Sequence, residues 1–107
     1  MEWQSLYLNV YLKKRQAGNL YRIFYSRAAQ KDIQKLKSAH LDKKAQELIN
    51  LIKENPFQTP PLFEKLSGDL KGAFSRRINN QHRLVYQVFE NELTIKIISL
   101  WTHYERT

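Results

Sequence analysis

Residues 75–86, Ser-Arg-Arg-Ile-Asn-Asn-Gln-His-Arg-Leu-Val-Tyr, decide the fold because they predict two strands joined by a polar turn. The first strand is expected at 73–78 and the second at 82–89, where apolar and polar side chains alternate. With the turn at its expected length, Arg77 lies directly opposite Arg83, and the two side chains share a face of the sheet. The other face of the second strand is apolar and consists of Leu84, Tyr86 and Val88.

The rest of the chain supplies further strands and two helices. A β-type run at 93–101 follows after a three-residue turn, and a shorter run covers 21–25. Ser26 is a good N-cap for a helix to about residue 37, and a 3.6-residue apolar period predicts a second helix at about 41–54. The expected fold is α+β, with two N-terminal helices packed on one face of a largely antiparallel four-stranded sheet.

The predicted alternation leaves the other face of the sheet without helices. Arg77 and Arg83 lie on that face, and a turn centred on Asn91 sets Arg83 opposite Ser99. Alternation continued beyond the third strand brings His103 to the same side. We therefore expect a helix-free surface that is open to a ligand and carries both arginines and this histidine.

The composition describes one small and strongly basic domain. The chain has 107 residues, with 18 Lys+Arg against 10 Asp+Glu, and its net charge of +8 suits an anionic partner such as nucleic acid. It has no cysteine and three widely spaced histidines, so we expect no metal and no cofactor. Without a membrane-length apolar run or a signal peptide, we expect a cytoplasmic protein with no membrane partner. Residues 1–19 differ from the remainder and are interpreted as an appendage.

Four kinds of side chain near the predicted hairpin are those needed to cleave a phosphodiester without a metal. They are the carboxylate of Glu64, the guanidinium groups around Arg83, the imidazole of His103 and the phenol of Tyr104. Taken singly, each has a plainer interpretation, as a solvated loop carboxylate, a surface cation or a packing residue near the C-terminus. His82 begins a strand after a turn and is expected to be structural. Asp32 and Asp42 are expected to be solvated helix charges.

Residues 70–86, Leu-Lys-Gly-Ala-Phe-Ser-Arg-Arg-Ile-Asn-Asn-Gln-His-Arg-Leu-Val-Tyr, strongly resemble the Txe/YoeB toxins of bacterial toxin–antitoxin systems, within the RelE-like superfamily. Glu64 in the preceding loop and the terminal pair His103-Tyr104 fit the same family. The resemblance covers about 21–104 and implies a RelE-like fold. The domains that it implies are an N-terminal extension at 1–19 and a toxin domain at 20–107.

The resemblance implies a ribosome-dependent mRNA endoribonuclease that inhibits translation. The 2′-hydroxyl of the RNA attacks its own 3′-phosphate and leaves a 2′,3′-cyclic phosphate, so DNA is not a substrate. Either Glu64 or His103 is the general base, because an ordinary glutamate is a weak base near neutral pH. A family lysine falls on Ser67 here, and Lys65 and Lys71 are its substitutes. The implied catalytic residues are Glu64, Arg83, His103 and Tyr104, and the RNA- or phosphate-binding candidates are Arg77, Lys65, Lys71 and Arg76.

The partners implied by the resemblance are a cognate YefM-like antitoxin, the ribosome and its mRNA, and a second copy of the chain in a homodimer. Two other functions fit the same fold. One is a RelE/ParE-fold toxin that inhibits a protein such as gyrase. The other is a non-catalytic RNA-binding regulator of translation. Fold alone does not separate the three, but an inhibitor or a simple RNA-binding module needs no acid–base set.

Overall fold

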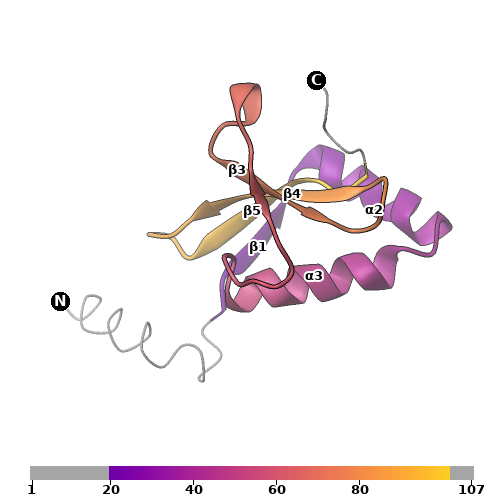
Figure 1. Ribbon diagram of the computed structural model, residues 1–107. Helices are drawn as coiled ribbons and strands as arrows, with labels where there is room; N and C mark the ends of the chain where they lie inside the picture. The colour runs from indigo at the N-terminus through magenta and orange to yellow at the C-terminus, as the bar shows by residue number, and fades with distance from the viewer. Residues whose placement is uncertain (1–19, 102–107) are drawn as a thin grey trace.

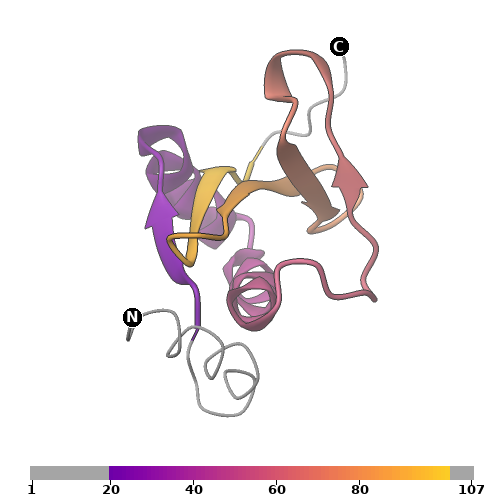
Figure 2. The ribbon, with the colours of Figure 1, turned by 90° about the vertical axis from the view of Figure 1, so that its left-hand side faces the viewer.

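The computed structural model describes residues 20–101, in which two helices pack against a five-stranded sheet (Figure 1). Both helices lie on one side of the sheet, and Figure 2 shows α3 end-on beneath it. The predicted α+β class, with two helices on one face of the sheet, is confirmed. In chain order, the elements are β1 (Arg22–Tyr25), α2 (Arg27–Ser38), α3 (Asp42–Glu54), β2 (Glu64–Lys65), the 3-10 helix η1 (Gly68–Leu70), β3 (Ala73–Arg77), β4 (Arg83–Phe89) and β5 (Thr94–Ser99).

The sheet has the strand order β1-β5-β4-β3-β2. β1 pairs in parallel with β5 and the other pairs are antiparallel, so the sheet is largely antiparallel, as predicted. The predicted number of four strands is wrong, because β2 adds a fifth at the edge next to β3. A strand of two residues is too short for alternation to mark it in the sequence. Only its pairing with β3 defines it, with Glu64 opposite Ser75 and Lys65 opposite Phe74.

The helices begin and end where the local sequence signals place them. At the start of α2, the Ser26 hydroxyl accepts a hydrogen bond of 2.9 Å from the backbone N–H of Ala29. The same hydroxyl donates a bond of 2.8 Å to the carbonyl of Ile98, so the cap also joins the helix to β5. α3 ends at Glu54 because Asn55, which precedes a proline, is extended. Neither helix within residues 20–101 combines the length and the apolar character that a membrane crossing needs.

The main core lies between the two helices and one face of the sheet. Leu84 and Tyr86 of β4 are fully buried there, as their alternation predicted. A second and smaller apolar cluster lies on the other face, where Leu66 and Leu70 pack against Val85. The prediction that this face is open to a ligand is therefore wrong for its middle. No α-helix within residues 20–101 covers it, but the chain around η1 does.

The hairpin of β3 and β4 has the predicted register, with Arg77 opposite Arg83. The predicted register between β4 and β5 is wrong by one residue over residues 94–97 and by two residues at Ser99, which lies opposite Val85 instead of Arg83. One residue of the difference comes from the turn, which covers residues 90–93, and one from an irregularity between Val85 and Tyr86. Relative to the predicted register, the one-residue shift exchanges the faces of residues 94–97 and brings Ile95 and Ile97 to the core. Ser99, which is shifted by two residues, stays on the face of Arg83.

Replacement of Ser26 by alanine removes both hydrogen bonds of the α2 cap. We expect it to lower the free energy of unfolding by about 1–2 kcal/mol. The matched control is Ser38→Ala, at the exposed end of the same helix, which should change the free energy by less than about 0.5 kcal/mol. Urea denaturation followed by far-UV circular dichroism measures both variants. Equal losses in the two would contradict the role given to the cap.

Candidate phosphate-binding and catalytic site

Three neighbouring strands bring four polar side chains to the face of the sheet that carries no α-helix. Glu64 of β2 lies opposite Ser75 of β3, and Arg77 of β3 lies opposite Arg83 of β4. Ser75 and Arg77 are two residues apart in one strand, so they project from the same face. Directly paired residues share a face as well, which brings the carboxylate, the hydroxyl and both guanidinium groups to one side of the sheet.

The guanidinium of Arg83 is held between a buried hydroxyl and an exposed carboxylate. Its Nη1 lies 3.0 Å from Oγ of Ser75, which is fully buried, and 3.5 Å from Oε1 of Glu64. The side chain of Arg83 is 20% exposed and that of Glu64 is 62% exposed. Within residues 20–101 the Nε and Nη2 groups of Arg83 have no hydrogen-bond partner. These two donors point the same way in a guanidinium and suit two oxygens of one phosphate.

Arg77 adds a second positive charge beside Arg83. The two residues are directly opposite each other in the β3–β4 ladder, where like charges repel. Arg77 is exposed, and no carboxylate in the described part of the chain forms an ion pair with it. An anion bound between the two guanidinium groups removes that repulsion, which makes this pair the electropositive centre of the site.

Arg76, a phosphate-binding candidate from the sequence, occupies a different environment. Its side chain is fully buried on the core side of β3. Nε donates to the hydroxyl of Tyr86 at 2.9 Å, and the Nη1 and Nη2 groups donate to the carbonyls of Pro61 at 2.5 Å and Pro56 at 3.1 Å. The guanidinium also lies 4.9 Å from the centre of the Phe63 ring, within the range of a cation–π contact. Arg76 is therefore a structural residue, because its donors are used inside the protein.

The phenol of Tyr86 completes this buried network. Its hydroxyl donates to the carbonyl of Pro56 at 2.8 Å while it accepts from Arg76. Burial raises the pKa of Tyr86, and the hydrogen bond and charge of Arg76 oppose that shift. The phenol thus stays protonated at neutral pH and remains a donor. Together, the two side chains fasten the loop after α3 to the β3–β4 hairpin.

Of the other predicted site residues, Lys65 and Lys71 make no hydrogen bond or ion pair with this group in the part of the chain that the structure describes. Lys65 lies opposite Phe74, so alternation places it on the face of β2 opposite to Glu64. Lys71 follows η1 and is exposed. His103 and Tyr104 lie outside the described residues. Among residues 20–101, no group of three or more His, Cys, Asp or Glu side chains is arranged to hold a metal ion.

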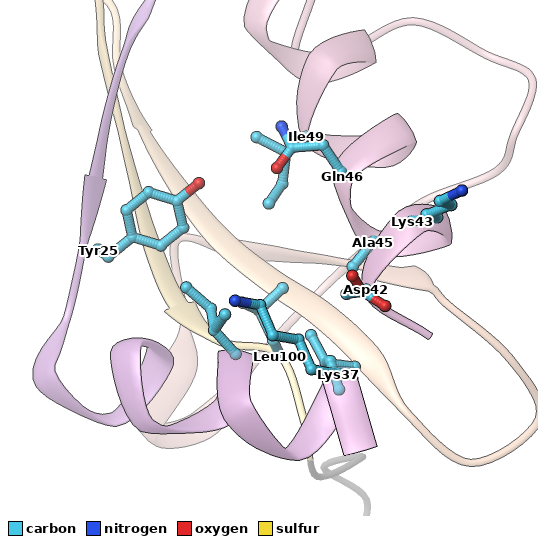
Figure 3. Close-up of a pocket in the computed structure, with 10 residues that line it drawn as sticks. Tyr25, Lys37, Asp42, Lys43, Ala45, Gln46, Ile49 and Leu100 are labelled. Atoms are coloured by element: carbon cyan, nitrogen blue, oxygen red, sulfur yellow. The ribbon is translucent and has the colours of Figure 1, made fainter. Parts of the chain in front are cut away.

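A cavity of about 240 Å³ lies between the helices and the sheet, away from these strands (Figure 3). Tyr25 reaches into it from β1 and Ile49 from α3, and Leu100 closes it after β5. Burial raises the pKa of Tyr25, so its phenol is neutral near pH 7. None of the four site residues lines this cavity, which we interpret as a gap in the packing of the two layers.

Comparisons with known proteins agree with this architecture. Residues 22–104 match the family model of the YoeB-like toxin of bacterial type II toxin–antitoxin systems, which is well over half of the chain. The chain belongs to this family. The toxin YoeB of Synechocystis sp. is 44% identical over 69 residues, which are 61% of this chain and 78% of the relative.

Solved structures of YoeB proteins have the same fold. The YoeB/ParE toxin from Agrobacterium tumefaciens superposes with a TM-score of 0.71 at 29% identity, over 78% of this chain and 99% of that one. A YoeB from Staphylococcus aureus, solved in a YoeB–YefM complex, gives a TM-score of 0.67 at 37% identity, over 78% and 98% of the two chains. The structure of a YoeB dimer from the same organism gives the same TM-score at 38% identity and covers the same shares.

Two residues of this YoeB-like chain contribute to the site or its surroundings and were not recognised from the sequence. Ser75 holds the Arg83 guanidinium, and its place two residues before Arg77 in the Ser-Arg-Arg motif is a signal that could have found it. Asp32 was expected to be solvated, and this is wrong. Its side chain is buried and its carboxylate binds two backbone amides. No local pattern distinguishes it from a surface aspartate on the same helix.

The buried network of Arg76 predicts a large difference between two adjacent arginines. Arg76→Lys keeps the charge, but one ammonium group cannot reach three acceptors in different directions, so unfolding should become easier by about 2 kcal/mol or more. Arg77→Lys makes the same chemical change at an exposed position and should alter stability by less than about 0.5 kcal/mol. Chemical denaturation of both variants measures the difference. Similar stabilities would contradict the structural role of Arg76.

Proposed function

We propose that this YoeB-like toxin is a ribosome-dependent mRNA endoribonuclease that works without a metal. The observation that carries the proposal is the group formed by Glu64, Ser75 and Arg83, with Arg77 in the facing position. A buried hydroxyl orients one arginine, a carboxylate lies beside it at the surface, and two of its donors remain for a phosphate. Family membership supports the same assignment, because the match to the YoeB-like toxin family covers residues 22–104 and so includes all four of these residues.

In the proposed reaction, the 2′-hydroxyl of the RNA attacks the adjacent phosphorus atom. The new P–O bond forms as the bond to the 5′-oxygen of the next nucleotide breaks, which leaves a 2′,3′-cyclic phosphate and a free 5′-hydroxyl. The step needs a base for the 2′-hydroxyl proton and an acid for the departing oxygen. Arg83, supported by Arg77, stabilises the negative charge on the phosphorane. His103 protonates the leaving oxygen, and Tyr104 orients the phosphate or stacks on a base.

Glu64 has the exposure that a base for an external hydroxyl requires. Its side chain is 62% exposed, and only one of its oxygens lies near Arg83. The other oxygen makes no hydrogen bond or ion pair with a residue of 20–101, so a 2′-hydroxyl can approach it without breaking the ion pair. His103 is the alternative base, since imidazole can serve in either direction near neutral pH.

The partners belong to the same proposal. We propose a YefM-like antitoxin as the cognate partner, because a related YoeB is solved in complex with YefM, and a homodimer, because another structure is a YoeB dimer. The antitoxin segment is expected to be acidic and to fold over the arginine pair. We further propose a toxin domain at 20–107, an N-terminal extension at 1–19, and a cytoplasmic location, where ribosomes and mRNA are found.

The decisive experiment is mRNA cleavage in a bacterial translating extract. Wild-type protein should cut translated mRNA and leave 2′,3′-cyclic phosphate ends. Arg83→Ala should slow cleavage about 10²–10³-fold, because a stabiliser of the phosphorane is lost, and His103→Ala about 10²–10⁴-fold. A 2′-deoxy substitution at the cut position should abolish cleavage there. The products and rates are read by primer extension and end-group analysis.

Exposed residues outside the site provide the control. The variant Glu47→Gln on α3 should cleave mRNA at the wild-type rate. Absence of cleavage by the wild type would reject the enzymatic proposal. Inhibition of gyrase by the same protein would then favour an inhibitor, and ribosome binding alone would favour a non-catalytic regulator. Undiminished cleavage by Arg83→Ala and His103→Ala would reject the proposed site but would leave the proposed endoribonuclease activity standing.

The basic surface of β1 and α2 predicts how the protein binds the ribosome. Arg22, Arg27, Lys31, Lys35 and Lys37 are all exposed. The acidic residue of α2, Asp32, is buried, so its charge does not neutralise this surface. Binding to ribosomal RNA should therefore weaken steeply with salt, because each neutralised phosphate releases counterions.

The measurement is ribosome binding between 50 and 200 mM salt, conditions over which several phosphate contacts cost orders of magnitude in affinity. Removal of three lysines by Lys31→Gln, Lys35→Gln and Lys37→Gln should reduce the slope of log K against log salt by about one per lysine. The matched control removes three lysines of α3 by Lys43→Gln, Lys44→Gln and Lys53→Gln. An unchanged slope in the α2 variant would show that this surface faces away from the ribosome.

A further inference from the structure

Side chains hold both backbone polar groups of Trp101, its N–H and its C=O. On one side, Oδ2 of Asp32 accepts hydrogen bonds from the N–H of Leu100 at 2.9 Å and the N–H of Trp101 at 3.2 Å. Asp32 comes from the middle of α2 and is 8% exposed. In the described part of the chain, no cation forms an ion pair with its carboxylate. The two backbone amides are thus the groups that satisfy this buried charge.

On the other side, His82 holds the carbonyl of Trp101. Its Nδ1 makes a hydrogen bond with that oxygen, and its ring stacks on the indole of Trp101 with 3.9 Å between centroids and 20° between planes. His82 is itself fixed in the β3–β4 turn. Its N–H donates to Oδ1 of Asn79 at 2.7 Å, and its carbonyl accepts from the N–H of Ile78 at 2.8 Å.

This arrangement lies where the chain leaves the sheet. β5 ends at Ser99, and the Leu100 side chain is buried in the core. Asp32 belongs to a helix on one face, and His82 belongs to the turn of the hairpin that carries Arg77 and Arg83. The two side chains therefore connect the end of β5 to the layer of helices and to the arginine hairpin at the same point.

We propose that Asp32 and His82 are positioning residues for the acid–base pair at the C-terminus. His103 and Tyr104 are the second and third residues after Trp101. Asp32 and His82 hold both backbone polar groups of Trp101 shortly before this pair in the sequence, and we infer the positioning role from these contacts. This inference rests on the proposed function, because His103 and Tyr104 are groups of that reaction.

A positioning role predicts a loss of rate with little loss of binding. Asp32→Ala should lower the single-turnover rate of mRNA cleavage on the ribosome about 10²-fold, the effect expected when a catalytic group is misplaced by about 1 Å. Ribosome affinity should stay within about threefold of wild type. Asp32→Asn keeps an oxygen that can accept hydrogen bonds from both amides. Its single-turnover rate should therefore lie within about tenfold of the wild-type rate. His82→Gln can donate a hydrogen bond to the Trp101 carbonyl, so its single-turnover cleavage rate should likewise be higher than that of His82→Ala.

Amide hydrogen exchange tests the contacts without reference to cleavage. In Asp32→Ala, protection should fall at Leu100 and Trp101 while Ile95 and Ile97 in the core of β5 keep theirs. The matched control is Asp42→Ala at the start of α3, which should change neither the exchange at Leu100 nor the cleavage rate. Unchanged exchange at Leu100 and Trp101 would overturn the contacts. Lost protection with wild-type cleavage would overturn the positioning role.

The two proposals fail in different ways. If wild-type protein cleaves no mRNA, the proposed function is rejected, and hydrogen exchange still decides whether Asp32 holds the end of β5. If wild type cleaves and Asp32→Ala unfolds, the comparison moves to Asp32→Asn and His82→Gln. Equal cleavage by His82→Gln and His82→Ala, both folded, would overturn the positioning role of His82.

Discussion

The pairing of β3 with β4 is the constraint on which the core and the site both depend. Because neighbouring residues of a strand face opposite ways, one ladder serves two environments. On the helix side it buries Leu84, Tyr86 and Arg76. On the other side it brings Arg77 opposite Arg83 and sets Ser75 beneath the Arg83 guanidinium. A slip of one residue would bury the site arginine and expose the core, so the apolar packing of β4 also protects the geometry of the site.

Two arginines of this hairpin illustrate how burial separates structure from function. Arg76 uses its donors on two loop carbonyls and a phenol, and it is shielded from solvent by aromatic rings. Arg83 uses one nitrogen on Ser75 and Glu64, and its other two nitrogens have no hydrogen-bond partner among residues 20–101. The same guanidinium fork thus fastens a loop in one case, and in the other it is the group that we propose for binding an oxyanion. Neighbouring positions carry these different roles because strand alternation sends them to different faces.

The aspartate of α2 and the histidine of the hairpin turn extend this plan to the C-terminal end of the sheet. A carboxylate taken out of water is stable only when its hydrogen bonds are replaced, and two successive amides replace them here. The imidazole holds the carbonyl of the same residue and covers its indole ring. The end of β5 is therefore anchored to both the helices and the hairpin. The two remaining residues of the family motif, His103 and Tyr104, follow shortly after it in the sequence.

Much of the fold could be predicted from local patterns in the sequence. Alternation in residues 82–89, the 3.6-residue period of α3 and the Ser26 cap predicted the main elements and the two-layer class, because these signals act between residues close in the sequence. The pairing of Arg77 with Arg83 followed as well, since a short turn ties the register of a hairpin to its length. The β4–β5 register did not, because the turn is one residue longer than predicted and the ladder is irregular between Val85 and Tyr86.

By itself, the sequence determined which residues could carry the chemistry and that Arg77 and Arg83 would face each other across a hairpin. Only the tertiary structure decided which charges are available. It buried Arg76 and Asp32, left Arg83 between Ser75 and Glu64, and made Glu64 part of a two-residue edge strand. The physical reason is that burial and hydrogen bonding of a charged side chain are set by partners far away in the chain. Leu100 lies 68 positions beyond Asp32, and Glu64 and Arg83 are 19 apart.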